Sequence, residues 1–430
     1  MTDPARPYGF TRRPEPRCLG AAMRGQQILD GVLPLTGGGI TGDPFGQPLG
    51  DGERAAELHG FGWLDDLAAL GSTGGRARAQ ALVLGWIAAH PEVPAAPPAG
   101  PGADPAWRAD VTGRRLMRWI FHAGQIMPGL GRADAQPVFD SLHAQLNFLT
   151  RTEAAPGLPR IEALAACAIA AMMLKGATGQ AAPALAALDD ALEDSIHQGV
   201  MRARCPESAL SCLTLLGWVQ ATADEAGVAL PAGIPAAIAD IAPVLRALRH
   251  ADGSLPRFHG SGRGAPGRLD HSLRAAHGPA LTLGGHAMGF ARLARSRATV
   301  VLDAAAPPAG PAAAQAHAST LGIEFTSARH PIVVSCGSGR MFGPAWARAS
   351  RATACHSTLS LTGLSSAKLL PADSHGHERL TLLPQKVWAG VCDARGDLMP
   401  PDAPPPPARQ PETILAGHDA WAGTHGLTHL

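Results

Sequence analysis

Apolar residues recur at helical spacing through the first 250 positions of the chain. The stripe formed by Leu116, Trp119, Ile120 and Ala123 predicts an amphipathic helix over 111–125. Stripes of the same period predict further helices over 76–89, 137–150, 159–175, 183–196, 206–220 and 235–248. Short loops join them, so successive helices should pack antiparallel. A ring of helical hairpins would bury every stripe, and a stack of generic helical repeats is the open alternative.

After position 285 the spacing of apolar residues changes to every second residue, which is typical of half-buried strands. Strands are predicted over 290–293, 299–302, 322–326, 332–335, 358–362 and 386–391. The predicted fold class is therefore an α/α toroid-like helical domain followed by an antiparallel β-sandwich. Its expected boundaries are an extended N-terminal arm (1–55), the toroid (56–250), an interdomain loop (251–285) and the sandwich (286–430).

Composition narrows the class of protein. The 430 residues are 46% hydrophobic and 17% charged, as expected for a globular protein with a large core. A net charge of +1 provides no basic field, so nucleic acid is not expected as a partner. The seven cysteines show no metal-finger or disulfide-framework spacing. Positions 1–24 show no signal-peptide pattern and no stretch could span a bilayer, so these features favour the cytoplasm.

The segment Arg351–Ser366 carries the most prominent candidate for chemistry. His356 directly precedes the predicted strand at 358–362, where its side chain can point from the sheet edge toward the helical half. An imidazole at that position either packs at a strand end or takes part in a site. The two interpretations are about equally supported by the residues alone.

Several segments of the chain together resemble one known family. They are 58–67 (LHGFGWLDDL), 107–116 (WRADVTGRRL), 157–164 (GLPRIEAL), 242–253 (APVLRALRHADG), 354–359 (ACHSTL) and 416–421 (AGHDAW). In this order they resemble the heparinase II/III family of polysaccharide lyases, and within it an uncharacterised alphaproteobacterial branch. The resemblance implies β-elimination beside the carboxylate of a uronic acid. That reaction needs a base, a group that neutralises the carboxylate, and an acid for the leaving oxygen.

The resemblance suggests catalytic candidates, each with a structural alternative. Arg204, in Arg204-Cys-Pro206, matches an element that opens a cavity-facing helix, and it could clamp a carboxylate or simply pair with an acid. His122 and Asn147 are expected near the inner ends of helices, although structural roles are favoured for both. His356 completes the catalytic set.

Two tryptophans and two histidines complete the predicted site. Trp107 and Trp119 could stack on a sugar, or belong to the core. Characterised relatives carry a structural metal, and the resemblance implies zinc held by His356 and His418. A third ligand is not identified: His375 and His377 are candidates, whereas Asp419 would point to the opposite face if its segment is extended. Because relatives continue past the equivalent of Leu430, the sandwich is expected to be incomplete.

The sequence also departs from the family pattern. Gln198–Met201 stands where the branch often carries a histidine, and Ala203 replaces a serine. The only tyrosine is Tyr8, in the N-terminal arm, so the tyrosine base of characterised relatives is missing. These departures remove the expected bases from the helical half.

Three functions follow in order of preference. The first is a lyase for acidic, uronate-containing polysaccharide of heparan or alginate type. The second is a catalytically impaired glycan-binding or envelope-associated protein of the same fold. The third, hydrolysis by paired carboxylates, ranks last because Asp65 and Asp66 are adjacent on a helix and diverge. The family implies the periplasm or cell envelope, with the cytoplasm as the alternative.

Overall fold

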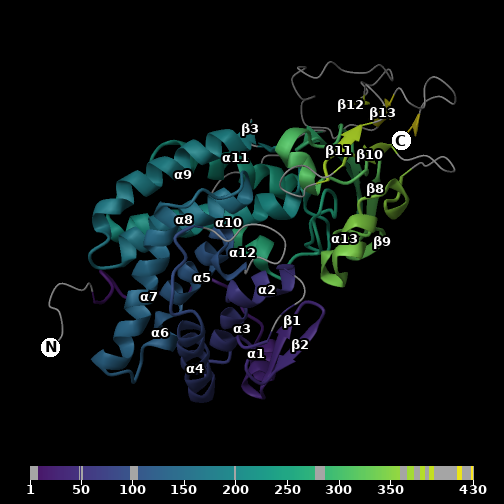
Figure 1. The fold of residues 1–430 in the computed structure, drawn as a ribbon. Coiled ribbons are helices and arrows are strands. Elements are labelled where there is room, and N and C mark those ends of the chain that lie inside the picture. Colours follow the sequence, from purple (N-terminus) through teal and green to yellow (C-terminus); the bar gives the residue numbers. More distant parts are fainter. Residues whose placement is uncertain are drawn as a thin grey trace. The chain divides into compact units, whose positions relative to one another are not determined.

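The chain folds into two compact units (Figure 1). The computed structural model describes residues 8–47, 49, 52–96, 105–197, 200–276, 286–358, 366–371, 378–382, 387–391, 414–418 and 428–429. Unit 1 comprises Met1–Glu193 and Leu215–Pro235, and unit 2 comprises Asp194–Thr214 and Ala236–Leu430. The helical residues 236–248 therefore belong to the same unit as the strands. No helix within these described ranges is long and apolar enough to cross a membrane.

Unit 1 is helical, as the apolar stripes predict. Its helices are α2 (Gly52–His59), α3 (Trp63–Ala69), α4 (Thr73–Ala89), α5 (Ala109–Phe121), α6 (Ala123–Ile126), α7 (Arg132–Thr150), α8 (Leu158–Met173), α9 (Ala181–Ser195) and the later part of α10 (Pro206–Ala226). Helices α5 and α8 pack closely because both carry small residues at their contact. A Cβ added to Gly113 would lie only 2.9 Å from the carbonyl oxygen of Glu162. The alanine-rich sequence of α8 is thus explained by a close helix approach.

The sequence predicted an extended N-terminal arm, and the structure corrects this prediction. The arm carries α1 (Ala22–Leu29) and a hairpin of β1 (Val32–Leu35) and β2 (Gly38–Thr41). Leu35 pairs with Gly38 across the turn at Thr36–Gly37, and both glycines have positive φ. Such angles suit glycine, so the Gly-rich stretch encodes a tight turn rather than an open loop. Buried apolar side chains hold this segment in unit 1: Ile28, Leu33, Leu35 and Ile40.

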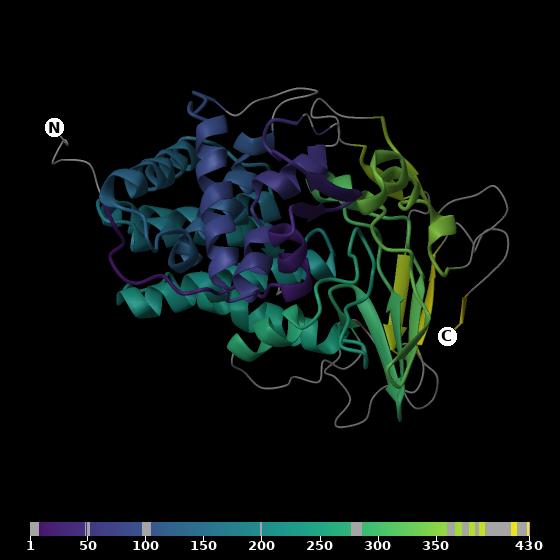
Figure 2. The same cartoon turned by 90° about the horizontal axis from the view of Figure 1, so that it is seen from below.

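Unit 2 combines helices with an antiparallel meander. Its sheet runs in the order β5 (His286–Ala287), β6 (Phe290–Arg295), β7 (Ala298–Asp303), β8 (Ile323–Ser327) and β9 (His330–Val333). The green arrows of Figure 2 show these strands side by side. The helices of the unit are most of α11 (Gly233–Leu248), α12 (Arg268–Ala275) and α13 (Pro344–Ala349), with the 3₁₀ turns η3 (Gly310–Gln315), η4 (Arg340–Phe342) and η5 (Thr353–Cys355).

Smaller sheets complete unit 2. Antiparallel pairs are formed by β3 (Ile196–His197) with β4 (Val200–Met201), by β10 (Ala367–Leu369) with β11 (Leu380–Leu382), and by β13 (Ile414–His418) with both β12 (Val387–Val391) and β14 (Thr428–His429). Five of the six predicted strands overlap observed ones, although the prediction for 332–335 shares only residues 332 and 333 with β9. At the sixth, residue 358 lies in a bend and 359–362 lie outside the described residues. The coarse fold, helices followed by antiparallel strands, is confirmed.

Candidate functional site

The guanidinium of Arg204 is the centre of a buried polar network in unit 2. Arg204 lies in the loop before α10, has a φ of +49°, and is 8% exposed. Its Nη2 donates to Oδ1 of Asp303 at 2.5 Å. Its remaining hydrogen bonds go to four carbonyl oxygens, those of Met288, Gly289, Ala305 and Ala306. These bonds occupy all three nitrogens, so a substrate carboxylate could bind this side chain only by displacing contacts within the protein.

Asp303, the last residue of β7, is fully buried. Its Oδ2 accepts a hydrogen bond from Ser319 Oγ at 2.6 Å and lies 3.1 Å from Nε2 of His259. Burial by itself would raise the pKa of Asp303, but the Arg204 guanidinium and His259 hold that pKa well below its usual range. The carboxylate is therefore ionised and balances the charge of Arg204.

His259 contributes a neutral imidazole to the network. Its Nδ1 accepts a hydrogen bond from the backbone N–H of His317 at 3.2 Å, so the proton of the neutral ring is on Nε2. Although Nε2 is close to Asp303, its direction is not that of a hydrogen bond. Burial lowers the pKa of His259 against the opposing effect of Asp303. The residue has a φ of +49°, so the backbone is strained where the ring enters the core.

His356 lies directly after η5 and is 7% exposed. Its Nδ1 is 2.5 Å from Oγ of Ser335, while its Nε2 has no hydrogen-bond partner among the described residues. The ring of His317 is 5.3 Å away, edge to face. Burial lowers the pKa of His356 to about 4, so its ring is neutral near pH 7. Burial opposes protonation of this ring, but the lone pair of a neutral imidazole nitrogen can bind a metal ion.

A second buried acid–histidine pair adjoins this network. Oε2 of Glu324, in β8, lies 3.1 Å from Nε2 of His250. Oε1 of the same carboxylate accepts hydrogen bonds from the backbone N–H groups of Arg257 and Ser335. Ser335 thus connects Glu324 to His356. Because both Glu324 oxygens are used within the fold, this pair is part of the framework that positions His356.

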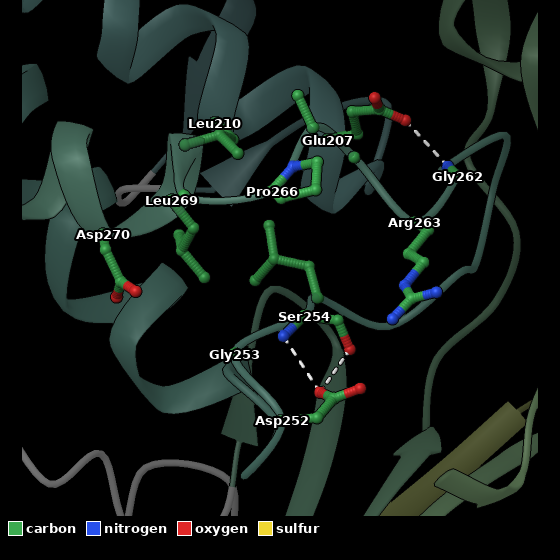
Figure 3. A pocket seen from close by; sticks show the side chains of 14 residues that line it. Glu207, Leu210, Asp252, Gly253, Ser254, Gly262, Arg263, Pro266, Leu269 and Asp270 are labelled. Carbon is green, nitrogen blue, oxygen red and sulfur yellow. Dashed lines mark hydrogen bonds between the residues drawn. The ribbon is translucent and has the colours of Figure 1, made fainter. Parts of the chain in front are cut away.

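A small cavity of about 170 Å³ opens in unit 2 (Figure 3). The first turn of α10, the loop 252–255, the glycine-rich segment 262–267 and the start of α12 form its wall. Glu207 accepts the backbone N–H of Gly262, and Asp252 accepts both the N–H and the hydroxyl of Ser254. The wall carries three carboxylates and one guanidinium, that of Arg263. This charge balance does not favour a polyanion such as a uronate chain.

The structure places the remaining predicted catalytic residues in unit 1. His122 follows α5 and its Nε2 lies 2.8 Å from Oδ1 of Asp65. Arg118 Nε donates to the other oxygen of Asp65 at 3.2 Å. Asn147 is exposed on α7 and does not contribute to that cluster.

Both predicted sugar-stacking residues are in the hydrophobic core. Trp119 is 1% exposed and Trp107 5% exposed. The ring of Trp86 lies 5.4 Å from that of Trp119, and the buried guanidinium of Arg115 covers Trp86 at 4.0 Å. In this structure neither indole offers a face to a sugar, and the aromatic cluster holds unit 1 together.

One group of possible metal ligands occurs among the described residues. Ligand atoms of Cys18, Asp65 and His122 lie within 4.8 Å of one another in unit 1. The cationic Arg118 already binds the carboxylate of Asp65, which opposes a metal ion there. The predicted zinc ligand His418 ends β13, but its side chain lies outside the described part, as do Asp419, His375 and His377. The zinc site therefore stays a prediction.

The sequence did not single out three members of the unit 2 network. Asp303 reads simply as the end of a strand, and His317 lies in an alanine-rich stretch without a motif. His259 belongs to the cluster of glycine, arginine and histidine between 251 and 277, which the sequence marked as a loop. That composition was the only available signal, because the contacts join distant segments.

Known proteins that are similar to this chain indicate its family and its fold. Residues 278–430 match the family described as heparinase II/III-like, C-terminal. The chain superposes on heparinase III with a TM-score of 0.61 and 14% identity, covering 78% of this chain and 60% of that one. A mutant of heparan sulfate lyase HepC from Pedobacter heparinus superposes with a TM-score of 0.51 and 14% identity, covering 85% and 63%. At such identities the likeness establishes the heparinase-type fold alone.

The match over residues 278–430, together with the heparinase-type fold, confirms the resemblance predicted from the sequence. The chain is also 29% identical over 343 residues to FtsZ-localized protein C of Caulobacter vibrioides. That match covers 77% of this chain and 57% of the relative. The chain thus spans less than two thirds of the length of these proteins.

Proposed function

We propose that this chain is a non-catalytic member of the heparinase II/III-like family that acts where FtsZ assembles. One observation carries the first half of the proposal: Arg204, the best carboxylate clamp that the sequence offers, is buried and bonded to Asp303 and four backbone carbonyls. The second half rests on the relative named FtsZ-localized protein C, whose name describes a location and no reaction.

The position of Tyr8 supports a non-catalytic role. Its ring packs 4.8 Å from that of Phe139 on α7, and the Arg132 guanidinium lies 5.1 Å from its centre. These contacts hold Tyr8 in unit 1 as a packing residue. The missing tyrosine base of the family is therefore not replaced by the one tyrosine of the chain.

The finer fold and the metal are part of the same proposal. By analogy with the heparin lyases we expect the helices to form an α/α toroid and the strands a β-sandwich. The free Nε2 of His356 fits a zinc ligand, and His418 would be the second. Such an ion would have a structural role. A cytoplasmic or an envelope location is equally open to test by cell fractionation.

Two measurements test the proposal together. The full-length protein is incubated with heparan sulfate, alginate and other uronates, and the ultraviolet absorbance of a new carbon–carbon double bond is followed. We expect no increase with any of them. In parallel, a fluorescent fusion is imaged beside labelled FtsZ, and purified protein is sedimented with FtsZ polymers. Sustained absorbance, or a diffuse fusion that does not sediment with the polymers, would refute the corresponding half.

A lyase for uronate-containing polysaccharide is the second candidate, favoured by the heparinase III fold over 78% of the chain. If turnover is found, His356→Gln should abolish it while leaving the fold intact, because His356 offers the neutral ring with a free nitrogen. Binding of an oligosaccharide by calorimetry without turnover would instead identify a glycan-binding protein. His330→Gln, which makes the same change at an exposed residue of β9, is the matched control.

A further inference from the structure

Two cysteines of unit 2 meet across a loop next to His356. Cys336 lies two residues beyond Val334, after β9, and Cys355 ends η5 directly before His356. The backbone N–H of Cys336 donates to the carbonyl oxygen of Cys355 at 3.3 Å. This single bond brings the two backbones close together, and natural disulfides join Cα atoms that are about 4.4–6.8 Å apart.

The two thiols also point in the same direction. Cys336 Sγ lies 3.9 Å from the carbonyl oxygen of Ser350, and Cys355 Sγ lies 3.3 Å from that of Ala349. These carbonyls are consecutive at the C-terminal end of α13, and Cys355 is near enough to contribute to the raised pKa of Cys336. The sulfur atoms are therefore neighbours in addition to the backbones, and both are reduced in this structure.

Exposure distinguishes this pair from the buried cysteines. Cys336 is exposed and Cys355 is half-buried, as is Cys18 in unit 1, whereas Cys167, Cys205 and Cys212 are buried. Burial raises the pKa of Cys167 and of Cys212 to about 12, which makes those thiols inert. Of the described cysteines, a small reagent in solution can reach Cys336, Cys355 and Cys18, and of these only Cys336 and Cys355 belong to unit 2.

We propose that Cys336 and Cys355 form a reversible disulfide by exchange with a small-molecule disulfide. The thiolate of one cysteine attacks the external disulfide, forms a mixed disulfide and releases one thiolate. The second cysteine then attacks the protein sulfur of the mixed disulfide and releases the other. One external disulfide is reduced to two thiols, which carry away the two cysteine protons, and the protein dithiol is oxidised by two electrons.

The surroundings set the rate and the consequence of this step. Burial and the neighbouring Cys355 raise the pKa of Cys336 to about 11, so exchange should be slow near pH 7 and faster at alkaline pH. Ser335 and His356, which directly adjoin the two cysteines, are themselves joined by the 2.5 Å contact of their side chains. The disulfide would close the segment 337–354 into a loop and fix α13 beside that pair.

The experiment uses the full chain, first reduced and then equilibrated with glutathione disulfide at pH 8.5. We expect the protein to lose two hydrogen atoms in mass, and peptide mapping to find Cys336 linked to Cys355. Oxidation should raise the Tm by roughly 5 °C, and a reducing agent should reverse the shift. Cys336→Ser and Cys355→Ser should each abolish the mass loss, and Cys18→Ser should not.

Three results would overturn the proposal. They are unchanged thiols after equilibration, a glutathione adduct that persists on Cys336 or Cys355 without a cross-link, and a cross-link that involves Cys18 or Cys392. The peptide map of the unmodified sequence remains decisive even if a serine variant does not fold.

Discussion

Each compact unit encloses an aspartate that is paired with an arginine and a histidine, but the two centres are built differently. In unit 1 Asp65 of α3 contacts Arg118 and His122, which are one helical turn apart along α5. Residues four apart lie on the same face of a helix, so helix formation alone brings the two partners together. This centre is partly open, since the Arg118 side chain is 17% exposed.

In unit 2 the partners of Asp303 come from separate loops. Arg204 precedes α10 and His259 lies between α11 and α12, and both have left-handed backbone angles. No periodicity connects them, and the Asp303 side chain is wholly excluded from solvent. The comparison shows that a polar centre formed by distant loops depends on all of its charges, because no water is available to replace a missing partner.

The largest expected effect is therefore that of Asp303→Asn. It leaves the Arg204 guanidinium buried without its counter-charge, and we expect the free energy of unfolding to fall by about 3–5 kcal/mol. Asp65→Asn should cost about 2 kcal/mol, because Arg118 is partly solvated. Urea unfolding followed by circular dichroism measures both.

The control for this pair is Asp270→Asn. Asp270 binds Arg249 at 2.8 Å with both side chains more than 40% exposed, so its removal should cost less than about 1 kcal/mol. Equal losses for Asp303→Asn and Asp65→Asn would mean that the separate origin of the partners makes no difference.

Arg204→Lys ranks second. Lysine keeps the charge but cannot make the five hydrogen bonds of the guanidinium, which reach Asp303 and four carbonyls. We expect a loss of about 2–3 kcal/mol. Arg118→Lys is the matched variant in unit 1 and should cost about 1 kcal/mol, because Arg118 bonds to Asp65 and to one carbonyl oxygen, that of Arg114. An unchanged free energy of unfolding in Arg204→Lys would contradict the assignment of Arg204 as a structural anchor.

The contrast between the two centres also explains which parts of the structure could be predicted from the sequence. Period-2 spacing predicted strands where β6, β7, β8 and β9 occur, and helical stripes predicted unit 1. The stripe in 111–125 also placed Trp119 correctly on the apolar face, although its role as core rather than sugar platform needed the packing around it. Local patterns sufficed wherever one element determines its own buried face.

The polar network of unit 2 could not be read from the sequence. Arg204 was singled out, but its partner Asp303 is 99 positions away and follows no motif. Hydrogen-bond partners at such separations are fixed by the tertiary fold, which a single sequence does not specify by spacing. The N-terminal hairpin was missed for a different reason: its glycines were interpreted as an open loop, whereas Gly37 and Gly38 make a tight turn.

A smaller change in the free energy of unfolding is expected when the pH is lowered. The folded-state pKa of Asp303 is depressed, so its stabilisation is present above the unfolded value near 3.9 and is lost as the pH falls through the folded value. Between pH 5 and pH 3 the unfolding free energy should therefore decrease less in Asp303→Asn than in the natural sequence, by about 1 kcal/mol. Urea midpoints at both pH values measure this. The pKa of Asp65 is also lowered. If the free energy of unfolding decreases equally with acid in Asp303→Asn and in the natural sequence, groups other than Asp303 cause the acid response.

The smallest expected effect concerns the histidines. In unit 1 only Nε2 of His122 bonds to Asp65, and Nδ1 has no hydrogen-bond partner among the described residues. Gln can present an N–H to the same carboxylate, so His122→Gln should cost about 0.5–1 kcal/mol. His259→Gln should cost about twice as much, because the backbone N–H of His317 would lose its acceptor in a closed core. Measured urea unfolding with the opposite order would show that His122, and not His259, is the histidine on which its centre depends.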